Sequence, residues 1–466
     1  MSIHEECGIF GIFDPSDDAA RITYFALFSL QHRGQEGAGI ATSNIKKLKI
    51  IKSQGLVAQV FNEENLGLLD GEIAIGHTRY STTGANKKEN ASPILIDCEI
   101  EQFAIAHNGN ITNTLDLKKT LPEGVFQKTT TDSEILGQVI SHSQGNTLEK
   151  KILNAMKKVE GAYCVTILTK TTLYAFRDPH GFRPLSLAKI NGSYAISSET
   201  CAFGIIGAEK IRDIEPGEVI KVTRNGLKSY FSPKKKKSFC IFEFVYFSRP
   251  DSLIGGQSVY SVRERLGKAL AKTCPKDADL VMGVPDSGIP AAIGFSIESG
   301  VPFREGLIKN KYIGRTFINP EQVERLKTIR LKLNALRSVI TGKKIVLVDD
   351  SIVRGNTMRQ IVTFLKEKGA KEVHVRITCP PIINPCFFGV DFPSSDELSA
   401  HEKSKEMICE QIKADSLEFI TLDDMVKATG FPKKEFCLAC FNGDYPVPVR
   451  LAGNAKLSLE FAGEDE

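Results

Sequence analysis

The chain has 466 residues, of which 42% are apolar and 25% charged, and its formal net charge is +4. This length predicts two or three domains, and the near-neutral charge gives no reason to expect nucleic acid or an anionic membrane as a partner. No apolar run reaches the length of a membrane span, and the polar, acidic start Met1–Glu6 is unlike a signal peptide. Eleven cysteines without a secretion signal predict a reducing, cytoplasmic setting and thiols that act chemically or bind metal.

The first predicted elements end in clusters of polar residues. Glu5–Phe13 alternates like a strand and carries a cysteine at position 7. A lone strand cysteine is usually a small buried hydrophobe, so its neighbours must decide whether it is a nucleophile. Further clusters lie where elements begin or end, as sites on a rigid scaffold do: Gln31–Gly39, Gly76–Thr82, Ala106–Asn110 and Thr131–Glu134.

Together these segments resemble the glutaminase domain of the class II amidotransferases, which are N-terminal nucleophile hydrolases, over roughly residues 7–230. The resemblance implies an αββα domain in which the thiol of Cys7 attacks the carboxamide of glutamine and releases ammonia. It implies that Arg79 clamps the substrate α-carboxylate and that Asp132 holds the α-ammonium group. Asn108 and the N–H of Gly109 would form the oxyanion hole, where each lost donor costs about 2.7–4 kcal/mol.

The position of Cys7 inside the sequence has a chemical consequence. An α-amine has an intrinsic pKa of about 7.7–8.0, so an N-terminal cysteine carries its own general base. The nitrogen of Cys7 is an amide as long as residues precede it. We therefore expect Met1–Glu6 to be a propeptide that is removed between Glu6 and Cys7.

Further along, a lysine run follows two predicted core strands. Gly161–Leu168 and Thr172–Phe176 are expected to pair, and His180 in the next turn is expected to be structural. The run Pro233–Lys237 is interpreted as a solvated turn and as the boundary of the first domain.

The second half is organised around Ile345–Val348, four aliphatic residues typical of a strand buried on both faces of a parallel sheet. Asp349 and Asp350 follow where open α/β sheets place ligands, and a glycine-containing loop leads into an amphipathic helix that Thr357 can cap. Free N–H groups at a helix start suit a phosphate, and paired carboxylates suit ribose hydroxyls or Mg²⁺. A sugar phosphate fits both halves of this motif.

The whole string resembles the signature of type I phosphoribosyltransferases, whose fold is a twisted parallel sheet. The resemblance implies one Mg²⁺ per subunit on Ser287, Asp349 and Asp350. It implies that phosphoribosylpyrophosphate contacts these residues: Asp349, Asp350, Ser351, Val353, Arg354, Gly355, Asn356, Thr357, Lys309, Tyr312 and Arg315. The last three belong to a basic segment that, by resemblance, closes over the substrate and completes an ammonia channel. From composition alone, a solvated basic helix is an even alternative.

The bridge Cys240–Ser252 extends the likeness over nearly the whole chain, to the glutamine phosphoribosylpyrophosphate amidotransferase family. Cys437 and Cys440 form a CxxC motif, which is compatible with zinc, a redox pair or an iron–sulfur cluster. Spacing does not separate these alternatives. A propeptide-bearing subgroup of the family carries a [4Fe–4S] cluster on four such cysteines, so the resemblance implies one cluster per subunit on Cys240, Cys386, Cys437 and Cys440.

These inferences predict an enzyme that makes 5-phosphoribosylamine, pyrophosphate and glutamate from glutamine and phosphoribosylpyrophosphate, the entry step of purine synthesis. The expected domains are a propeptide (1–6), a glutaminase (7–235), a phosphoribosyltransferase with the iron–sulfur site (236–450) and a tail (451–466). By resemblance, purine nucleotides inhibit the enzyme, and it is a homo-oligomer, either dimer or tetramer.

Two other functions fit the sequence less well. A sugar-isomerising class II amidotransferase would need isomerase domains in place of the acid-pair motif. A DNA-binding regulator would need a helix-turn-helix or a strongly basic face, and neither is evident.

Overall fold

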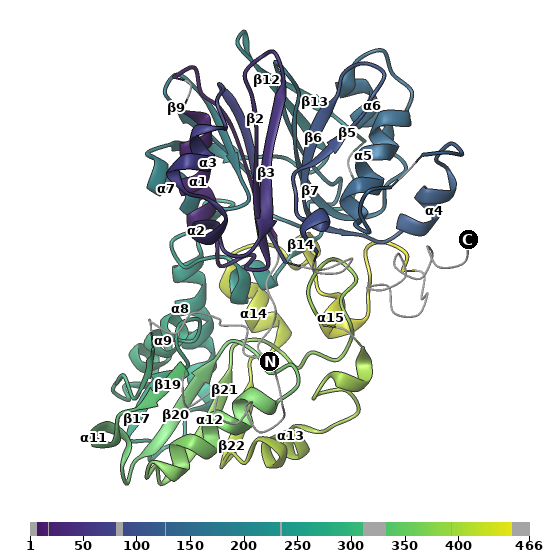
Figure 1. Ribbon diagram of the computed structural model, residues 1–466. Coiled ribbons are helices and arrows are strands. Elements are labelled where there is room, and N and C mark those ends of the chain that lie inside the picture. The colour runs from purple at the N-terminus through teal and green to yellow at the C-terminus, as the bar shows by residue number, and fades with distance from the viewer. Residues whose placement is uncertain are drawn as a thin grey trace.

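The computed structural model describes residues 7–16, 18–80, 87–125, 127–233, 235–310, 332–392 and 394–449. The expectations for residues 1–6, Tyr312, Arg315 and the tail 451–466 therefore lie outside the described residues. Two sheets stack in the N-terminal half, and a smaller sheet forms the centre of the C-terminal half (Figure 1). Within the described ranges, none of the helices combines the length and the apolar character needed to cross a bilayer.

The N-terminal half is a sandwich of two antiparallel sheets. The first has seven strands in the order β11-β9-β10-β1-β4-β2-β3, and the second has six in the order β13-β12-β8-β7-β6-β5. The strands of the first sheet are β1 (Gly8–Phe13), β2 (Gly37–Ser43), β3 (Leu48–Gln54), β4 (Ile73–Arg79), β9 (Ser186–Ile190), β10 (Ser193–Ser197) and β11 (Glu209–Asp213). Those of the second sheet are β5 (Ile94–Ile96), β6 (Phe103–Ile111), β7 (Gly161–Leu168), β8 (Leu173–Arg177), β12 (Glu218–Thr223) and β13 (Gly226–Phe231).

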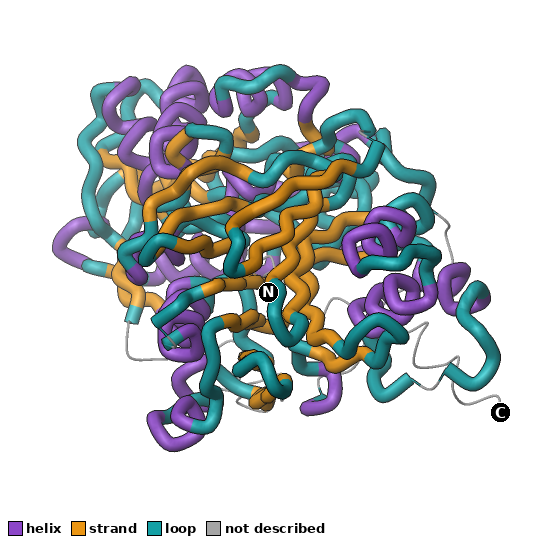
Figure 2. Tube along the Cα trace, turned by 90° about the horizontal axis from the view of Figure 1, so that it is seen from above, coloured by secondary structure: helices purple, strands orange, loops and turns teal. Residues whose placement is uncertain are grey.

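Helices cover the outer face of each sheet, which gives the predicted αββα layers (Figures 1 and 2). The first sheet is covered by α1 (Ala19–Ser29), α2 (Val57–Val60), α3 (Glu63–Gly67) and α7 (Cys201–Ile206), and the second by α4 (Thr114–Lys119), α5 (Asp132–His142) and α6 (Leu148–Ala155). Apolar side chains alternate along the strands, so one cluster fills the space between the sheets and two others lie under the helices. Strand β1 is buried throughout and lies between β10 and β4, so residue 7 enters the middle of the first sheet.

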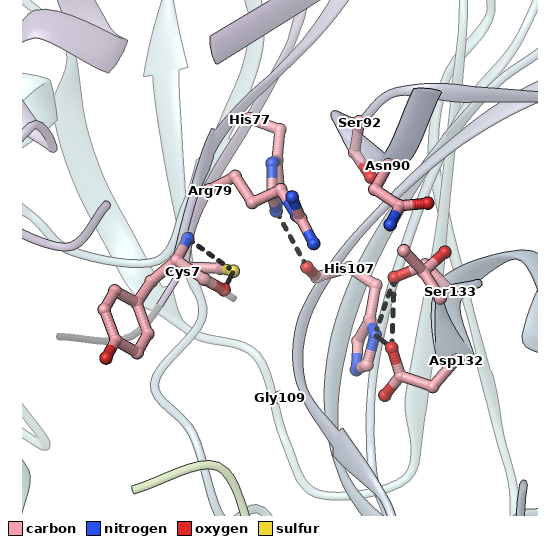
Figure 3. A pocket seen from close by; sticks show the side chains of 11 residues that line it. Cys7, His77, Arg79, Asn90, Ser92, His107, Gly109, Asp132 and Ser133 are labelled. Carbon is pink, nitrogen blue, oxygen red and sulfur yellow. Dashed lines mark hydrogen bonds and ion pairs between the residues drawn. The ribbon is translucent and has the colours of Figure 1, made fainter. Parts of the chain in front are cut away.

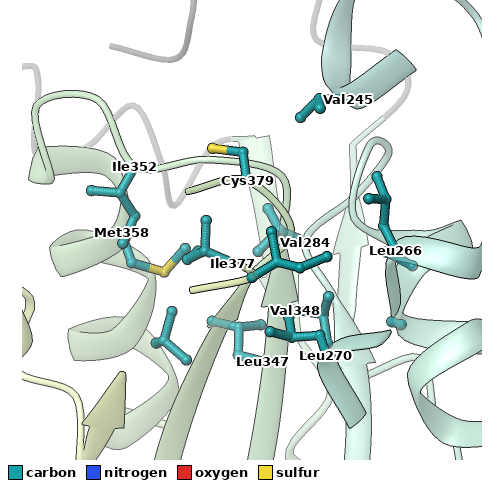
Figure 4. Close-up of a cluster of buried hydrophobic side chains, with 14 of the residues drawn as sticks. Val245, Leu266, Leu270, Val284, Leu347, Val348, Ile352, Met358, Ile377 and Cys379 are labelled. Atoms are coloured by element: carbon teal, nitrogen blue, oxygen red, sulfur yellow. The ribbon is translucent and has the colours of Figure 1, made fainter. Parts of the chain in front are cut away.

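The C-terminal half is built on a parallel sheet of order β17-β20-β21-β22. Its strands are β17 (Leu280–Gly283), β20 (Lys344–Asp349), β21 (Glu372–Ile377) and β22 (Ser416–Phe419); its longer helices are α8 (Val259–Leu270), α9 (Ile289–Ser299), α12 (Asn356–Glu367), α13 (Lys405–Ile412) and α14 (Leu422–Thr429). Ile345–Val348 is the buried central strand that the sequence predicts. Leu347 and Val348 pack with Leu270 and Met358 in the core of this half (Figure 4).

The start of α12 differs from the prediction. The helix begins at Asn356, and Gly355 occupies the N-cap position with a φ of 75°. Thr357 therefore lies inside the first turn, and the prediction that it caps the helix is wrong. A left-handed glycine turns the chain into the helix two residues earlier than the hydroxyl pattern suggested.

Short elements complete the described part of the chain. They are η1 (Lys88–Asn90), β14 (Phe239–Cys240), η2 (Glu243–Phe247), β15 (Leu253–Ile254), β16 (Gln257–Ser258), η3 (Ala271–Thr273), β18 (Leu307–Lys309), β19 (Leu333–Ala335), α11 (Arg337–Ile340), η4 (Ser395–Glu397), η5 (Lys433–Glu435), β23 (Phe436–Cys437) and α15 (Ala439–Asn442). The lysine run lies between β13 and β14, and the ring Nδ1 of His180 is 2.8 Å from the carbonyl oxygen of Lys236. Strand β14 pairs in parallel with β23, which brings the C-terminal segment back to the junction between the halves.

The close packing of α8 against α9 yields a test of the fold. A Cβ atom at Gly267 would lie 1.8 Å from the carbonyl oxygen of Ala291, so the two helices must separate to admit it. We expect Gly267→Ala to lower the free energy of unfolding by about 1–3 kcal/mol, measured by urea or thermal unfolding. The control is Gly204→Ala on α7, where no atom lies within 4 Å of the added Cβ and a small gain is expected. Equal stability of the two variants would contradict this packing.

Candidate active sites

Cys7 lies beside a small pocket where the two sheets of the sandwich meet the start of α5 (Figure 3). The end of β4 contributes Arg79, β6 contributes Gly109, and the first turn of α5 contributes Asp132. The lining residues are Cys7, His77, Arg79, Tyr80, Asn90, Ser92, His107, Gly109, Thr131, Asp132 and Ser133. The pocket thus brings together residues that are far apart in the sequence.

The thiol of Cys7 is held by the backbone of Tyr80. Its Sγ lies 3.3 Å from the carbonyl oxygen of Tyr80 and accepts a hydrogen bond from the N–H of the same residue at 3.4 Å. Burial raises the pKa of this thiol to about 12, so it is protonated at neutral pH. Attack on a carbonyl therefore requires a base that takes the thiol proton.

Two charged groups face each other across the pocket. The guanidinium of Arg79 points into the space in front of Cys7, and Asp132 lies on the far wall (Figure 3). One oxygen of Asp132 accepts from the N–H of Ile111 at 3.1 Å, and the other is 3.8 Å from Nδ1 of His107. Burial disfavours the carboxylate of Asp132, but His107 and backbone N–H groups outweigh it and hold its pKa below the usual range. An ionised carboxylate opposite a guanidinium matches the two charges of a free amino acid.

Of the two residues predicted to form the oxyanion hole, Gly109 lines the pocket and Asn108 does not. Gly109 lines the pocket, and its φ of 147° and the carbonyl oxygen of Ala162 leave no room for a side chain. Asn108, its neighbour on β6, is buried and donates from Nδ2 to the hydroxyl of Ser198 at 3.3 Å. It is not among the described residues that line the pocket, so its role stays a prediction.

Sequence reasoning missed two histidines of this pocket. His77 is neutral because burial lowers its pKa to about 3, and its Nε2 donates to the carbonyl oxygen of His107 at 3.0 Å. His107 bridges toward Ser133 and Asp132. Both histidines lie inside the polar clusters around Arg79 and Asn108, and their positions in those clusters were the available signal.

The acid pair lies at the C-terminal end of β20, as predicted. Burial raises the pKa of both Asp349 and Asp350, and for Asp349 the neighbouring carboxylate adds to the effect. The N–H of Asp350 donates to Asp349 at 2.9 Å, and the hydroxyls of Ser287 and Ser351 bond to Asp350. A half-buried and a buried carboxylate with a nearby hydroxyl are hard oxygen donors, and a divalent cation would supply the positive charge they lack. The donor set therefore fits Mg²⁺.

In the loop after the acid pair, Val353 and Arg354 contact residues of another segment, 397–399. Val353 is buried and accepts through its carbonyl from the N–H of Ser399 at 2.7 Å, while Arg354 pairs with Glu397 at 2.6 Å. Gly355 and Asn356 form the start of α12, which presents its N-terminus on this side of the sheet. Lys309 pairs with Asp286, so it reaches the loop that carries Ser287.

The four predicted cysteine ligands gather at the junction between the halves. Cys240 and Cys437 are directly opposite each other in the β14–β23 pair. The half-buried Cys440 lies within electrostatic reach of Cys437, Cys386 and Cys240, and also of Cys379, which is not a predicted ligand. Cys386 Sγ accepts from the N–H of Phe388 at 3.4 Å, and Cys437 accepts from the N–H of Ala439. Four neighbouring thiols, two of which accept from backbone N–H groups, suit thiolate ligation of a cluster. Among the described residues, no group of three or more His, Cys, Asp or Glu side chains is arranged to hold a metal ion.

Comparison with known proteins finds counterparts for both halves of the chain. Residues 77–204 match the model of the glutamine amidotransferase domain, and residues 257–382 match that of the phosphoribosyl transferase domain. The chain is 48% identical to the amidophosphoribosyltransferase of Synechococcus elongatus, across 98% of this chain and 94% of the relative. It is 46% identical to that of Bacillus subtilis, across 96% and 95% respectively. This chain belongs to the amidophosphoribosyltransferase family.

Solved structures support this membership in the amidophosphoribosyltransferase family. The B. subtilis glutamine phosphoribosylpyrophosphate amidotransferase, solved with ADP and GMP, aligns with a TM-score of 0.91 at 44% identity, covering 97% of this chain and all of that one. A structure described as the allosteric regulatory enzyme of purine biosynthesis aligns with a TM-score of 0.92, also at 44% identity, covering 97% of this chain and 98% of that chain. The predicted combination of an N-terminal nucleophile glutaminase and a phosphoribosyltransferase is confirmed, whereas the domain limits stay predictions.

The contact between His107 and Asp132 predicts a pH effect on glutamine binding. Without His107 the pKa of Asp132 should rise, so the carboxylate would protonate at a higher pH than in the native protein. We expect His107→Asn to raise the KM for glutamine by roughly three- to tenfold more at pH 5.5 than at pH 8, measured by steady-state kinetics. His180→Asn, outside the pocket, is the control and should show no such difference. A KM raised by the same factor at both pH values would contradict the electrostatic role.

Proposed function

We propose that this protein is a glutamine-dependent amidophosphoribosyltransferase that acts in the first committed step of purine synthesis. Glutamine is hydrolysed at Cys7, and the ammonia reaches C1 of phosphoribosylpyrophosphate to give 5-phosphoribosylamine, pyrophosphate and glutamate. One observation carries the proposal. A single chain that aligns with amidophosphoribosyltransferases over nearly its full length holds both a thiol pocket with opposed charges and an acid pair on a parallel sheet.

At the first site, Arg79 holds the α-carboxylate of glutamine and Asp132 holds its α-ammonium group, which presents the carboxamide carbon to Cys7. The α-amine exposed by removal of Met1–Glu6 takes the thiol proton and returns it to the leaving ammonia. The N–H of Gly109 and the amide of Asn108 stabilise the oxyanion. For this role the Asn108 side chain must exchange its 3.3 Å bond to Ser198 for one to the substrate. Water then hydrolyses the γ-glutamyl thioester to glutamate.

At the second site, Asp349, Asp350 and Ser287 hold one Mg²⁺ per subunit. A bound cation would supply positive charge that offsets the negative charge of the departing pyrophosphate. The loop Ser351–Thr357 and the N-terminus of α12 bind the 5-phosphate through backbone N–H groups. In this proposal Lys309, which pairs with Asp286 next to Ser287, contacts the pyrophosphate, as do Tyr312 and Arg315. Ammonia needs no further base, so the site acts mainly through positioning and charge.

Cys240, Cys386, Cys437 and Cys440 hold one [4Fe–4S] cluster per subunit, which ties the C-terminal segment to the junction. The convergence of the four thiols, with backbone N–H donors to Cys386 and Cys437, supports this part of the proposal. The protein acts in the cytoplasm as a homo-oligomer, dimer or tetramer, and purine nucleotides inhibit it. The presence of ADP and GMP in the B. subtilis structure supports nucleotide regulation.

Cys7→Ala tests the division of labour between the sites. We expect this variant to lose glutamine-dependent formation of pyrophosphate by at least about 10³-fold, because no nucleophile remains. Activity with free ammonia should stay within about twofold of the native value, since the second site is untouched. Asp350→Asn is the converse control and should lose both activities. Equal loss of both activities in Cys7→Ala would contradict two separable sites.

The cluster and the propeptide are tested on one anaerobic preparation. We expect about four iron and four acid-labile sulfide per chain and an N-terminal sequence that begins at Cys7. Cys440→Ser should lose most of the iron, whereas Cys274→Ser, a half-buried thiol outside the group, should keep it. Stoichiometric zinc without sulfide would overturn the cluster assignment. Active protein with an intact mass that still includes Met1–Glu6 would overturn the propeptide assignment.

A further inference from the structure

A buried guanidinium holds the main chain of the residue that carries the thiol. Arg33, from the cluster Gln31–Gly39, is 1% exposed, and its Nε donates to the carbonyl oxygen of Cys7 at 3.1 Å. This bond fixes the peptide that follows the thiol-bearing Cα atom. Arg33 does not line the pocket in which Arg79 and Asp132 face each other. Its contact is with the main chain of Cys7, outside the lining of the pocket.

Two buried carboxylates hold Arg33 in place. Its NH1 group donates to Glu199 at 2.5 Å and to Glu243 at 3.0 Å, and its NH2 group donates to the second oxygen of Glu243 at 2.9 Å. The side chains of both glutamates are 0% exposed. Burial disfavours their ionisation, but the facing cations outweigh it and hold both pKa values below the usual range. Two ionised carboxylates therefore fix the orientation of the Arg33 guanidinium.

The two carboxylates come from different halves of the molecule. Glu199 follows β10 of the sandwich, whereas Glu243 begins η2, beyond the lysine run. The residues around Glu243 belong to the hydrophobic core of the C-terminal half: Phe242, Phe244, Val245 and Phe247. One of the two partners of Arg33 is thus fixed by the packing of the other half.

Residues 248–252, at the end of the bridge Cys240–Ser252, donate hydrogen bonds to both carboxylates. The hydroxyl of Ser248 donates to Glu243 at 2.6 Å, and that of Ser252 donates to Glu199 at 2.7 Å. The backbone N–H of Arg249 donates to the same oxygen of Glu199 at 2.8 Å. The glutaminase and transferase chemistry described above leaves this motif without a role, and these contacts give it one.

We propose that Glu243 is a positioning residue for the glutaminase reaction, acting on Cys7 through Arg33 together with Glu199. The proposal rests on the proposed role of Cys7 as nucleophile. The carboxylate of Glu243 orients the guanidinium, and the guanidinium holds the Cys7 carbonyl, so the thiol keeps one direction relative to the bound carboxamide. A displacement of about 1 Å at a reacting group can cost about 10²-fold in rate. The glutaminase site is consequently complete only when the second half of the chain is folded against it.

The test compares glutamine-dependent with ammonia-dependent activity in the full-length protein. For Glu243→Gln we expect kcat with glutamine to fall roughly 10- to 100-fold while the KM for glutamine changes less than about threefold. Ammonia-dependent activity should stay within about twofold, because the acid pair is untouched. Arg33→Lys keeps the charge but loses the planar guanidinium. It should show the same fall in glutamine-dependent activity with little change in ammonia-dependent activity. Ser248→Ala removes one hydroxyl and leaves Glu243 charged. Its glutamine-dependent activity should fall relative to its ammonia-dependent activity, but by less than in Glu243→Gln. This variant replaces Glu243→Gln in the test if Glu243→Gln does not fold.

Glu218→Gln is the matched control. Glu218 has a side chain that is 0% exposed and binds Arg212 through two bonds of 2.6 and 2.7 Å within the same half of the molecule. It should lose thermal stability as Glu243→Gln does while keeping the ratio of the two activities. A parallel loss of both activities in Glu243→Gln and Ser248→Ala, or an unchanged ratio, would overturn the positioning role. Glutamine-dependent activity that survives Cys7→Ala would instead refute the proposed function itself.

Discussion

The ion pairs among Arg33, Glu199 and Glu243 are the constraint on which the geometry of the first site depends. Three charged side chains are removed from water at the place where the two halves of the molecule meet. Burial of charge is tolerated only when every group is paired and hydrogen-bonded, and removal of one partner of a buried pair typically costs about 3–5 kcal/mol. Each carboxylate here accepts from the guanidinium and from a serine hydroxyl as well. The halves are therefore held in one relative orientation, and the start of β1 is held with them.

The second site depends on the opposite electrostatic arrangement. Asp349 and Asp350 are adjacent in sequence, and the end of β20 keeps their like charges together in a buried position. Nothing in the immediate pair balances that charge, although Arg263 lies close enough to Asp350 to lower its pKa. The first site fixes an atom by matching opposite charges, whereas the second holds two acidic groups whose ionisation is disfavoured unless a cation supplies positive charge.

The junction between the halves also gathers the cysteines. Strand β14 follows the sandwich in the chain and pairs with β23, which places Cys240 opposite Cys437. Cys240 lies only a few residues before Glu243. Arg183 approaches Glu243 at 3.6 Å and also donates to the carbonyl oxygen of Phe388, two residues after Cys386. The ion pairs and the proposed cluster thus lie in the same junction between the halves. Each would help to hold the residues of the other in position.

Elements whose signal is local can be predicted from the residues alone. The aliphatic run of β20, its acid pair and the alternating strands β1, β7 and β8 follow from short-range pattern, and they lie where that pattern predicts. The start of α12 escaped prediction because the left-handed φ of Gly355 outweighed the capping preference of a hydroxyl. Only the tertiary structure decided that Asn108 turns toward Ser198, that His107 meets Asp132, and that Arg33 finds a partner 210 residues away in Glu243. Those contacts join distant segments, and their geometry depends on how sheets and halves pack, which residue spacing along a chain does not encode.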